Sequence, residues 1–234
     1  TVTKEKIYSR DQNLWHISHE GGDIEQLENE HNEEVLYMMV TPPERAKDTP
    51  TYVDITFEKG WPVKVDGESL SPATLLQKLN KIAGENGVGV ADIVENRIVG
   101  MKSRGIYETP GGTLLMESLM ELETIVFDKD TLNFKKLVSQ KYAEIAYNGQ
   151  WFTPIKYALD AFVDSIDEVL TGTIKLKLYK GHIKIAGRFT ENALYDEGIS
   201  SFGSSELYSH KDAEGFIKLF SLPNTIRAYK KLSK

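Results

Sequence analysis

The densest group of chemically capable side chains lies between residues 92 and 109, where charged and polar residues interrupt an apolar segment. Its polar members are Asp92, Glu95, Asn96, Arg97, Lys102, Arg104, Tyr107 and Glu108. Charged groups inside an apolar segment must find partners or face a cleft. Two interpretations therefore stand: a set of internal ion pairs, or a pocket for a small zwitterion. In such a pocket a carboxylate holds an ammonium group, and hydroxyls and cations hold a carboxylate.

A second polar patch runs from Tyr8 to Ser18 and includes Ser9, Arg10 and Asp11. Its hydroxyl groups could add donors to the same pocket. Ordinary loop and helix-cap hydrogen bonding explains the same residue types equally well. Both interpretations stay open at this point.

Histidines and glycines form patterns that favour structural roles. His16 and His19 are three residues apart and His31 follows, but no zinc motif such as HExxH supports them. The segment 84–89 is glycine-rich, yet it lacks the flanking strand, helix and lysine of a phosphate loop, so it predicts a helix end and a turn. The segment 110–113 opens a helix, and either anion binding or close packing would explain its glycines.

Composition excludes several classes of protein. The 234 residues include 28 Lys and Arg against 35 Asp and Glu, a net charge of −7, which argues against a general nucleic-acid binder. No cysteine is present, which rules out disulfides, thiol nucleophiles and cysteine-bound metals. The longest apolar run, 35–40, is far shorter than the roughly 20 residues of a membrane span. We therefore expect neither a nucleic-acid nor a membrane partner.

Periodicity predicts the elements that must position these residues. Apolar residues alternate over 51–57 and 61–65, and again over 174–178 and 183–185, which predicts two hairpins. A capping residue followed by proline predicts helix starts, and these pairs are Ser71-Pro72, Thr109-Pro110 and Thr153-Pro154. A further helix is expected to open at Asp130 or Thr131, and the apolar residues between 93 and 101 are expected to form a buried strand pair or run. The acidic run 20–34 predicts a solvated face or loop.

These elements predict an α+β fold: a mixed or antiparallel sheet, a helical cluster and a protruding C-terminal helical arm. The arm begins with a short helix, breaks at Pro223 and ends in a basic amphipathic segment. So many apolar residues at a terminus are expected to dock on another surface. We divide the chain into a domain over 1–211 and an arm over 212–234.

Six blocks of the sequence resemble the argininosuccinate synthase family, in the same order. They are YSRDQNLWHISHEGG at 8–22, GVGVADIVENRIVGMKSRGIYETPGGT at 87–113, KYAEIAYNGQWFTP at 141–154, TGTIKLKLYKG at 171–181, ALYDEG at 193–198 and KDAEGFIKLFSLP at 211–223. The resemblance covers only the C-terminal part of that enzyme. The family's Ser-Gly-Gly-x-Asp nucleotide loop is missing, and a polar start without Met suggests that another domain precedes Thr1.

The resemblance implies an ATP-dependent ligase of arginine biosynthesis that joins citrulline and aspartate, giving argininosuccinate, AMP and pyrophosphate. Carried over residue by residue, its citrulline contacts fall on Ser9, Ser18, Glu95 and Tyr107. Glu95 would hold the α-ammonium group, and the three hydroxyls would orient the rest. ATP with Mg²⁺ and aspartate would be held mainly by the missing domain. We therefore expect the isolated chain to be inactive, and we assign it no catalytic or metal-binding residue.

The family further implies a cytoplasmic homotetramer assembled through the C-terminal arm. The sequence departs from the family pattern at Val90, usually Arg, at His19, usually Tyr, and in the acidic run 23–34. None of these departures touches the four citrulline residues, but Val90 removes a cation that could brace its strand. The alternative interpretation is a free-standing amino-acid-binding or oligomerisation module derived from the enzyme.

Overall fold

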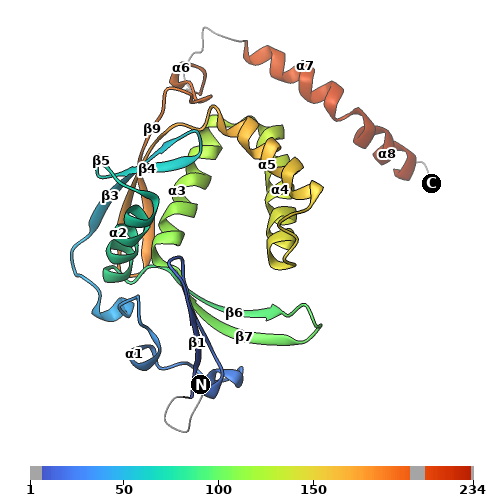
Figure 1. Ribbon diagram of the computed structural model, residues 1–234. Coiled ribbons are helices and arrows are strands. Elements are labelled where there is room, and N and C mark those ends of the chain that lie inside the picture. The colour runs from blue at the N-terminus through green and yellow to red at the C-terminus, as the bar shows by residue number, and fades with distance from the viewer. Residues whose placement is uncertain (1–6, 201–208, 233–234) are drawn as a thin grey trace. The chain divides into compact units, whose positions relative to one another are not determined.

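The computed structural model describes residues 7–200 and 209–232, which group into two units. The first unit ends at Asn192 and the second begins at Ala193. Two antiparallel sheets and several helices confirm the predicted α+β class (Figure 1). This boundary after Asn192 follows from contacts within each unit. The functional division into a substrate domain over 1–211 and an arm over 212–234 stays a prediction.

The larger sheet of the first unit has five strands in the order β5-β4-β3-β8-β9. Its strands are β3 (Thr51–Glu58), β4 (Trp61–Val65), β5 (Glu68–Ser69), β8 (Gly172–Tyr179) and β9 (His182–Phe189). Both predicted hairpins are confirmed, and the central pair β3 and β8 runs in continuous register from Thr51 opposite Leu178 to Phe57 opposite Gly172. Alternate residues of β8 are fully buried, as period-two patterning requires.

Helices α2 (Pro72–Glu85) and α3 (Pro110–Val126) pack on this sheet and form the main apolar core. Residues with 0% exposure at its centre are Ile55, Val65, Leu79, Ala83, Leu114, Leu122, Leu170, Ile174, Leu176 and Leu178. Ser71 caps α2 as predicted, since its hydroxyl accepts from the Thr74 N–H. Gly87 follows α2 at φ +74°, which confirms the predicted helix end and turn.

Two predicted helix caps are wrong although the helices themselves begin where expected. The Thr109 hydroxyl bonds the hydroxyl of Thr113, and the Thr153 hydroxyl donates to the Gln150 carbonyl, so neither caps its helix. The helix expected to open at Asp130 or Thr131 is α4 (Lys129–Tyr147), and its cap is Asp128. It lies beside α5 (Pro154–Asp167), and Phe134 meets Phe162 edge-on between them.

The smaller sheet has four strands in the order β1-β2-β7-β6. They are β1 (Ser9–Gln12), β2 (Ile17–Glu20), β6 (Val90–Asn96) and β7 (Lys102–Glu108). One face carries a small apolar cluster of Ile24, Leu36 and Ile106, to which the 3₁₀ turn η1 (Gly22–Glu25) and α1 (Glu33–Leu36) contribute. The acidic run is therefore mostly solvated, as predicted, but it inserts Ile24 completely into this cluster. A second turn, η2 (Pro43–Arg45), precedes β3.

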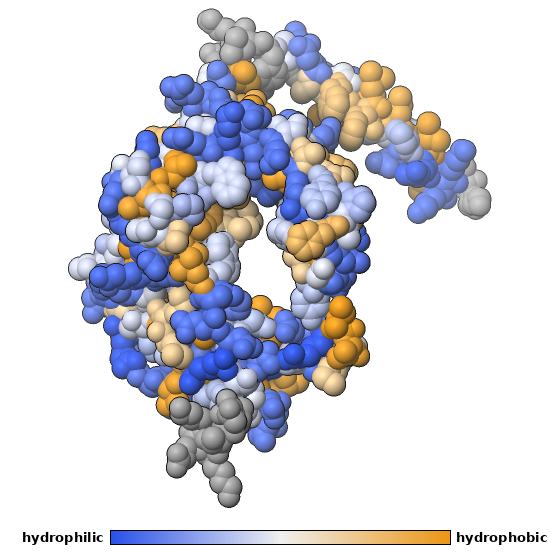
Figure 2. Space-filling view, viewed as in Figure 1, coloured by the Kyte–Doolittle hydropathy of each residue, from blue (hydrophilic) through white to orange (hydrophobic). Residues whose placement is uncertain are grey.

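The prediction that the apolar residues of 93–101 would be buried is wrong. They form a strand pair, but β6 is an edge strand and the turn beyond it projects from the sheet. Ile98 and Val99 are 70% and 75% exposed, and Figure 2 shows apolar side chains at the end of this hairpin.

The second unit contains α6 (Glu197–Ser200), α7 (His210–Phe220) and α8 (Leu222–Leu232). The predicted break lies at Ser221 rather than at Pro223, because proline fits the first turn of the following helix. Phe216 stacks on Phe220, and both are largely exposed within this unit. Across residues 7–200 and 209–232, no helix combines the length and the apolar character needed to cross a membrane.

Candidate functional site

The four predicted citrulline residues lie on one face of the four-stranded sheet. Ser18 of β2 is directly opposite Tyr107 of β7, which is in turn opposite Ala91 of β6. Side chains of a strand alternate between faces, so Glu95, four residues from Ala91, shares the face of Tyr107. Ser9 shares it too, because it is two residues from Asp11, the partner of Ser18. We call this the front face.

A tyrosine and a carboxylate form a hydrogen-bonded pair on the front face. The Tyr107 hydroxyl donates to Glu95 Oε1 over 3.0 Å. The tyrosine ring reaches across Gly105, where an added Cβ would lie only 3.0 Å from the ring. Burial and the hydrogen bond to Glu95 raise the pKa of Tyr107 to about 12. The hydroxyl is therefore protonated at neutral pH, and its one hydrogen is donated to Glu95.

The two serines differ in exposure. Ser18 is 7% exposed, and its hydroxyl makes a long 3.5 Å hydrogen bond to the Asp11 carbonyl. Ser9 is exposed and lies opposite Glu20 on the outermost strand. The His16 ring lies 6.1 Å from the Tyr107 ring, centre to centre, just before β2 begins. The front face thus offers hydroxyls on three adjacent strands and one carboxylate on the fourth.

A cation lies near this carboxylate. Arg97, just after β6, donates from Nη2 to Glu20 Oε2 over 2.5 Å and to the Ser103 hydroxyl over 3.2 Å. Glu20, Arg97 and Ser103 line a cavity of about 630 Å³ together with Lys102. Some charges of the polar segment therefore form ion pairs and a cavity opens beside them, but none of the four predicted citrulline residues lines it, so the zwitterion pocket stays a prediction.

The opposite face of the same sheet carries a polar network that the sequence did not reveal. Glu108 and His19 are completely buried, and His19 Nε2 lies 2.7 Å from Glu108 Oε1. Arg10 Nε donates to His19 Nδ1 over 3.0 Å. Burial alone would raise the pKa of Glu108, but His19 and three backbone amides together lower it. His19 thus has a structural role, as we predicted from the lack of a supporting zinc motif.

A second polar cluster on this back face fixes the loop after β2. Arg104 makes two hydrogen bonds to the Asp92 carboxylate, 2.9 and 2.6 Å long, and these bonds lower the pKa of Asp92. Nη1 of Arg104 also donates to the carbonyls of Ile24, Gln26 and Asn29. One guanidinium therefore fastens the 24–29 segment to β7.

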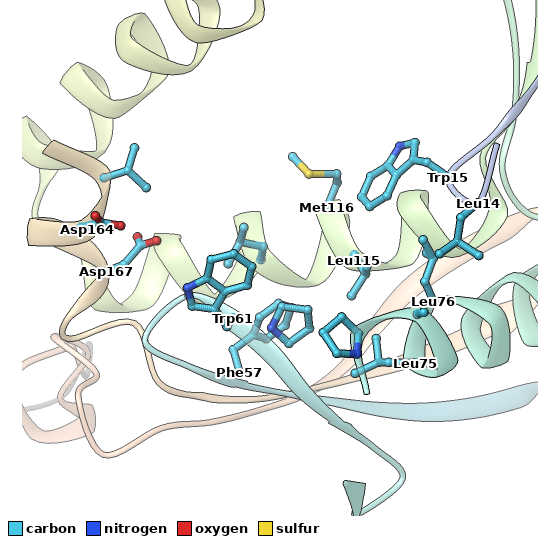
Figure 3. A pocket seen from close by; sticks show the side chains of 16 residues that line it. Leu14, Trp15, Phe57, Trp61, Leu75, Leu76, Leu115, Met116, Asp164 and Asp167 are labelled. Carbon is cyan, nitrogen blue, oxygen red and sulfur yellow. The ribbon is translucent and has the colours of Figure 1, made fainter. Parts of the chain in front are cut away.

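A separate apolar groove of about 590 Å³ lies beside α2 and α3 (Figure 3). Trp15 and Leu14 at the tip of the β1–β2 hairpin line one end, Trp61 lines its middle, and Asp164 and Asp167 face the other end. Burial raises the pKa of Asp167 to about 6. No local pattern predicts this groove, because its lining comes from segments far apart in the chain.

The glycines at 111 and 112 allow close packing, which is one of the two explanations of this segment. A Cβ at Gly112 would lie 2.7 Å from the Trp15 ring, and one at Gly111 would lie 2.6 Å from Asn80 Oδ1. The Gly111 N–H, moreover, already donates to Asn80 over 2.8 Å. Among the residues that the structure describes, no three His, Asp or Glu side chains gather closely enough to hold a metal ion.

Comparison with known proteins places this architecture in a family. Residues 8–227 match the family model described as the arginosuccinate synthase C-terminal domain. The chain is 64% identical over 233 residues to the argininosuccinate synthase of Clostridium acetobutylicum, covering all of this chain and 58% of that protein. It is 66% identical over 229 residues to that of Clostridium botulinum strain Langeland, covering 98% of this chain and 57% of the relative.

The chain therefore spans less than three fifths of the length of these relatives. The resemblance seen in the six sequence blocks is confirmed over almost the whole chain. This chain belongs to the argininosuccinate synthase family and corresponds to its C-terminal domain.

Proposed function

We propose that this chain forms the citrulline-binding part of an argininosuccinate synthase, a ligase that consumes ATP to join citrulline and aspartate. The products are argininosuccinate, AMP and pyrophosphate. The observation that carries the proposal is the Tyr107–Glu95 pair, which lies on the same sheet face as Ser9 and Ser18. The match to relatives that are longer synthases supports the enzyme over the alternative of a free-standing module.

Each front-face group has a chemical role toward citrulline. The Glu95 carboxylate accepts a charge-assisted hydrogen bond from the α-ammonium group. The Tyr107 hydroxyl occupies only Oε1 of Glu95, so Oε2 is left for the ligand. The hydroxyls of Ser18 and Ser9 donate to the polar groups of the bound amino acid. Holding citrulline in one orientation contributes to the rate by positioning its ureido group for attack.

ATP with Mg²⁺ and aspartate are proposed to bind mainly to the part of the longer protein that precedes this chain. This assignment rests on the chain's coverage of 58% and 57% of its two relatives. We accordingly expect no turnover by the isolated chain, and a cytoplasmic location for the whole enzyme. Release of pyrophosphate from ATP by the purified chain alone would contradict this division of labour.

Calorimetric titration of the full-length protein with L-citrulline tests the site. Replacing Glu95 by Ala removes the partner of a charged group and is expected to weaken binding by about 2–5 kcal/mol. Glu117→Ala, which changes an exposed glutamate on α3, is the matched control and is expected to leave the affinity unchanged. Unaltered citrulline binding by the Glu95 variant would overturn the assignment of the site.

Helices α7 and α8 are proposed to assemble the enzyme into a homotetramer. Phe216, Phe220 and Leu232 are 63%, 74% and 84% exposed in their unit, a large apolar area for a terminal segment. Deleting residues 212–234 is therefore expected to lower the molar mass measured by light scattering. An unchanged number of subunits would remove these helices from the interface.

A further inference from the structure

Three of the four front-face residues are each followed in the chain by a member of the polar network on the back face. Arg10 follows Ser9, His19 follows Ser18, and Glu108 follows Tyr107. Neighbouring residues of a strand point to opposite faces. The network consequently runs directly behind the row of hydroxyls, across β1, β2 and β7.

The hydrogen bonds of this network have a defined direction. Arginine can only donate, so Nδ1 of His19 must accept from Arg10 Nε over 3.0 Å. Nε2 then carries the ring hydrogen and donates it to Glu108 over 2.7 Å. The ring of His19 on β2 therefore bonds to β1 through Nδ1 and to β7 through Nε2.

Glu108 joins the network to a distant segment. Its carboxylate accepts from the backbone N–H groups of Met38, Met39 and Val40 at 2.8, 2.7 and 2.8 Å. It is 0% exposed and has four donors, so it is a fully satisfied buried anion. Removing the charge would leave several of these donors without a partner in the interior.

Apolar patterning does little to fix the register of β1 and β2, because Ile17 is the one buried apolar residue in these two strands. All four residues of β1 are exposed, and β2 pairs with β7 through only three residue pairs, from Ile17 to His19. Register is weakly specified in a strand without a buried apolar set, and a slip of one residue moves every side chain to the other face. A slip of β1 or β2 would turn Ser9 or Ser18 away from Tyr107.

We propose that Arg10, His19 and Glu108 are positioning residues for citrulline, because their hydrogen bonds hold β1, β2 and β7 in the one register that aligns the front-face hydroxyls. This inference rests on the proposed function. His19 is the central member of the network, because its Nδ1 and Nε2 bond side chains on the two strands that flank β2.

The experiment compares variants of the full-length protein by citrulline titration and by hydrogen exchange with mass spectrometry. His19→Leu and Glu108→Gln are expected to weaken citrulline binding by up to about 100-fold, since a misplacement of about 1 Å can have an effect of this size. His19→Gln keeps an amide donor for Glu108 and is expected to recover part of this loss. Glu123→Gln is the matched control, because it alters another buried glutamate, which pairs with Lys135 between α3 and α4. It is expected to leave the citrulline affinity within about twofold of the wild type.

Hydrogen exchange supplies a readout that does not require the ligand. The proposal predicts faster exchange of the β1 and β2 amides in His19→Leu, with unchanged exchange in the five-stranded sheet. Wild-type affinity and wild-type protection of these strands in both His19→Leu and Glu108→Gln would overturn it. Failure of the wild type itself to bind citrulline would refute the proposed function, whereas the exchange data would still decide whether the network fixes the register.

Discussion

The two sheets of the first unit are stabilised in different ways. The five-stranded sheet packs on α2 and α3 through an extensive apolar core, in which Phe57, Leu79 and Leu122 are at most 1% exposed. The four-stranded sheet has an apolar cluster of only three buried residues. In place of a core it has the Glu108 network and the Arg104 cluster on its back face.

This difference separates the sheet that stabilises the fold from the sheet that carries the candidate site. Apolar burial stabilises in proportion to area and is indifferent to direction. Hydrogen bonds in a buried network are directional, so they fix where each strand lies. The sheet that carries the candidate site is the one held by directional bonds, which is the arrangement that a precisely shaped site requires.

The largest effect is expected from breaking the apolar core. Leu79 is 0% exposed, and Leu79→Ala should lower the free energy of unfolding by about 3–5 kcal/mol because it removes buried methyl groups and leaves a cavity. Urea denaturation followed by tryptophan fluorescence measures this. Val99→Ala, at a position 75% exposed, is the control and should change the free energy by less than about 0.5 kcal/mol. Equal losses in the two variants would contradict this account of the core.

A smaller loss is expected when the polar sheet loses one of its clamps. The Arg104 side chain is 9% exposed, and Arg104→Ala leaves three carbonyl groups and the Asp92 carboxylate without their hydrogen-bond donor. Because Asp92 is partly exposed, we expect a loss of about 2–3 kcal/mol in the free energy of unfolding. Lys102→Ala, an exposed neighbour on the same strand, should be nearly neutral in the same denaturation. A neutral Arg104 variant would mean that the sheet does not depend on this cation.

The junction between β7 and α3, where Gly89 lies against Pro110, should lose stability when a single methyl group is added. Gly89 has φ +106°, and an added Cβ would lie 2.4 Å from Cα of Pro110, where β7 leads into α3. Gly89→Ala should therefore lower the thermal midpoint, at a cost of about 2 kcal/mol. Gly100 has a similar φ of +92° but open space around it, so Gly100→Ala isolates the cost of the backbone angle alone. Equal shifts would show that the contact with Pro110 adds nothing.

The smallest effect is the pH dependence of stability that arises from Asp167. Burial raises the pKa of Asp167 from 3.8 to about 6, so the folded state binds more protons than the unfolded state between these values. This group therefore adds stability as the pH falls through 6 and costs stability above it. Since Asp167 is only half-buried, Asp167→Asn should stabilise the protein by about 1 kcal/mol at pH 7 and have no effect near pH 4.

Glu108 has the opposite sign and provides the comparison. Its lowered pKa means that its contribution is present above the ordinary pKa of glutamate and is lost as the pH falls. Denaturation curves of the wild type and of Asp167→Asn across pH 4–7 measure the difference. A constant gap between the two proteins over this range would contradict the raised pKa of Asp167.

Much of the fold could be predicted because it follows from local patterns. Strict alternation located both hairpins of the five-stranded sheet, and Ser71-Pro72 located the start of α2. The same reasoning failed at two helix caps, because the hydroxyls of Thr109 and Thr153 bond other groups three or four residues away in the chain. It also failed for the apolar 93–101 segment, which lies at a sheet edge that no local pattern reveals.

The site shows the same limit. The sequence brought forward Ser9, Ser18, Glu95 and Tyr107 through resemblance, and the structure adds that they share one face. The network behind them joins residues 89 positions apart, His19 and Glu108, so no spacing rule could find it. The apolar groove is a further example, because it is assembled from the hairpin tip, α2, α3 and α5.

The alternation of front and back residues also matters for redesign. A substitution at Ser9, Ser18 or Tyr107 alters what the sheet presents to a ligand, whereas its neighbour in the chain, turned the other way, keeps the strands together. Selection or engineering can therefore vary the front-face positions while the back-face hydrogen bonds that hold the strands are left in place. A sheet built in this way suits a library that varies the front-face residues while the back-face network is kept.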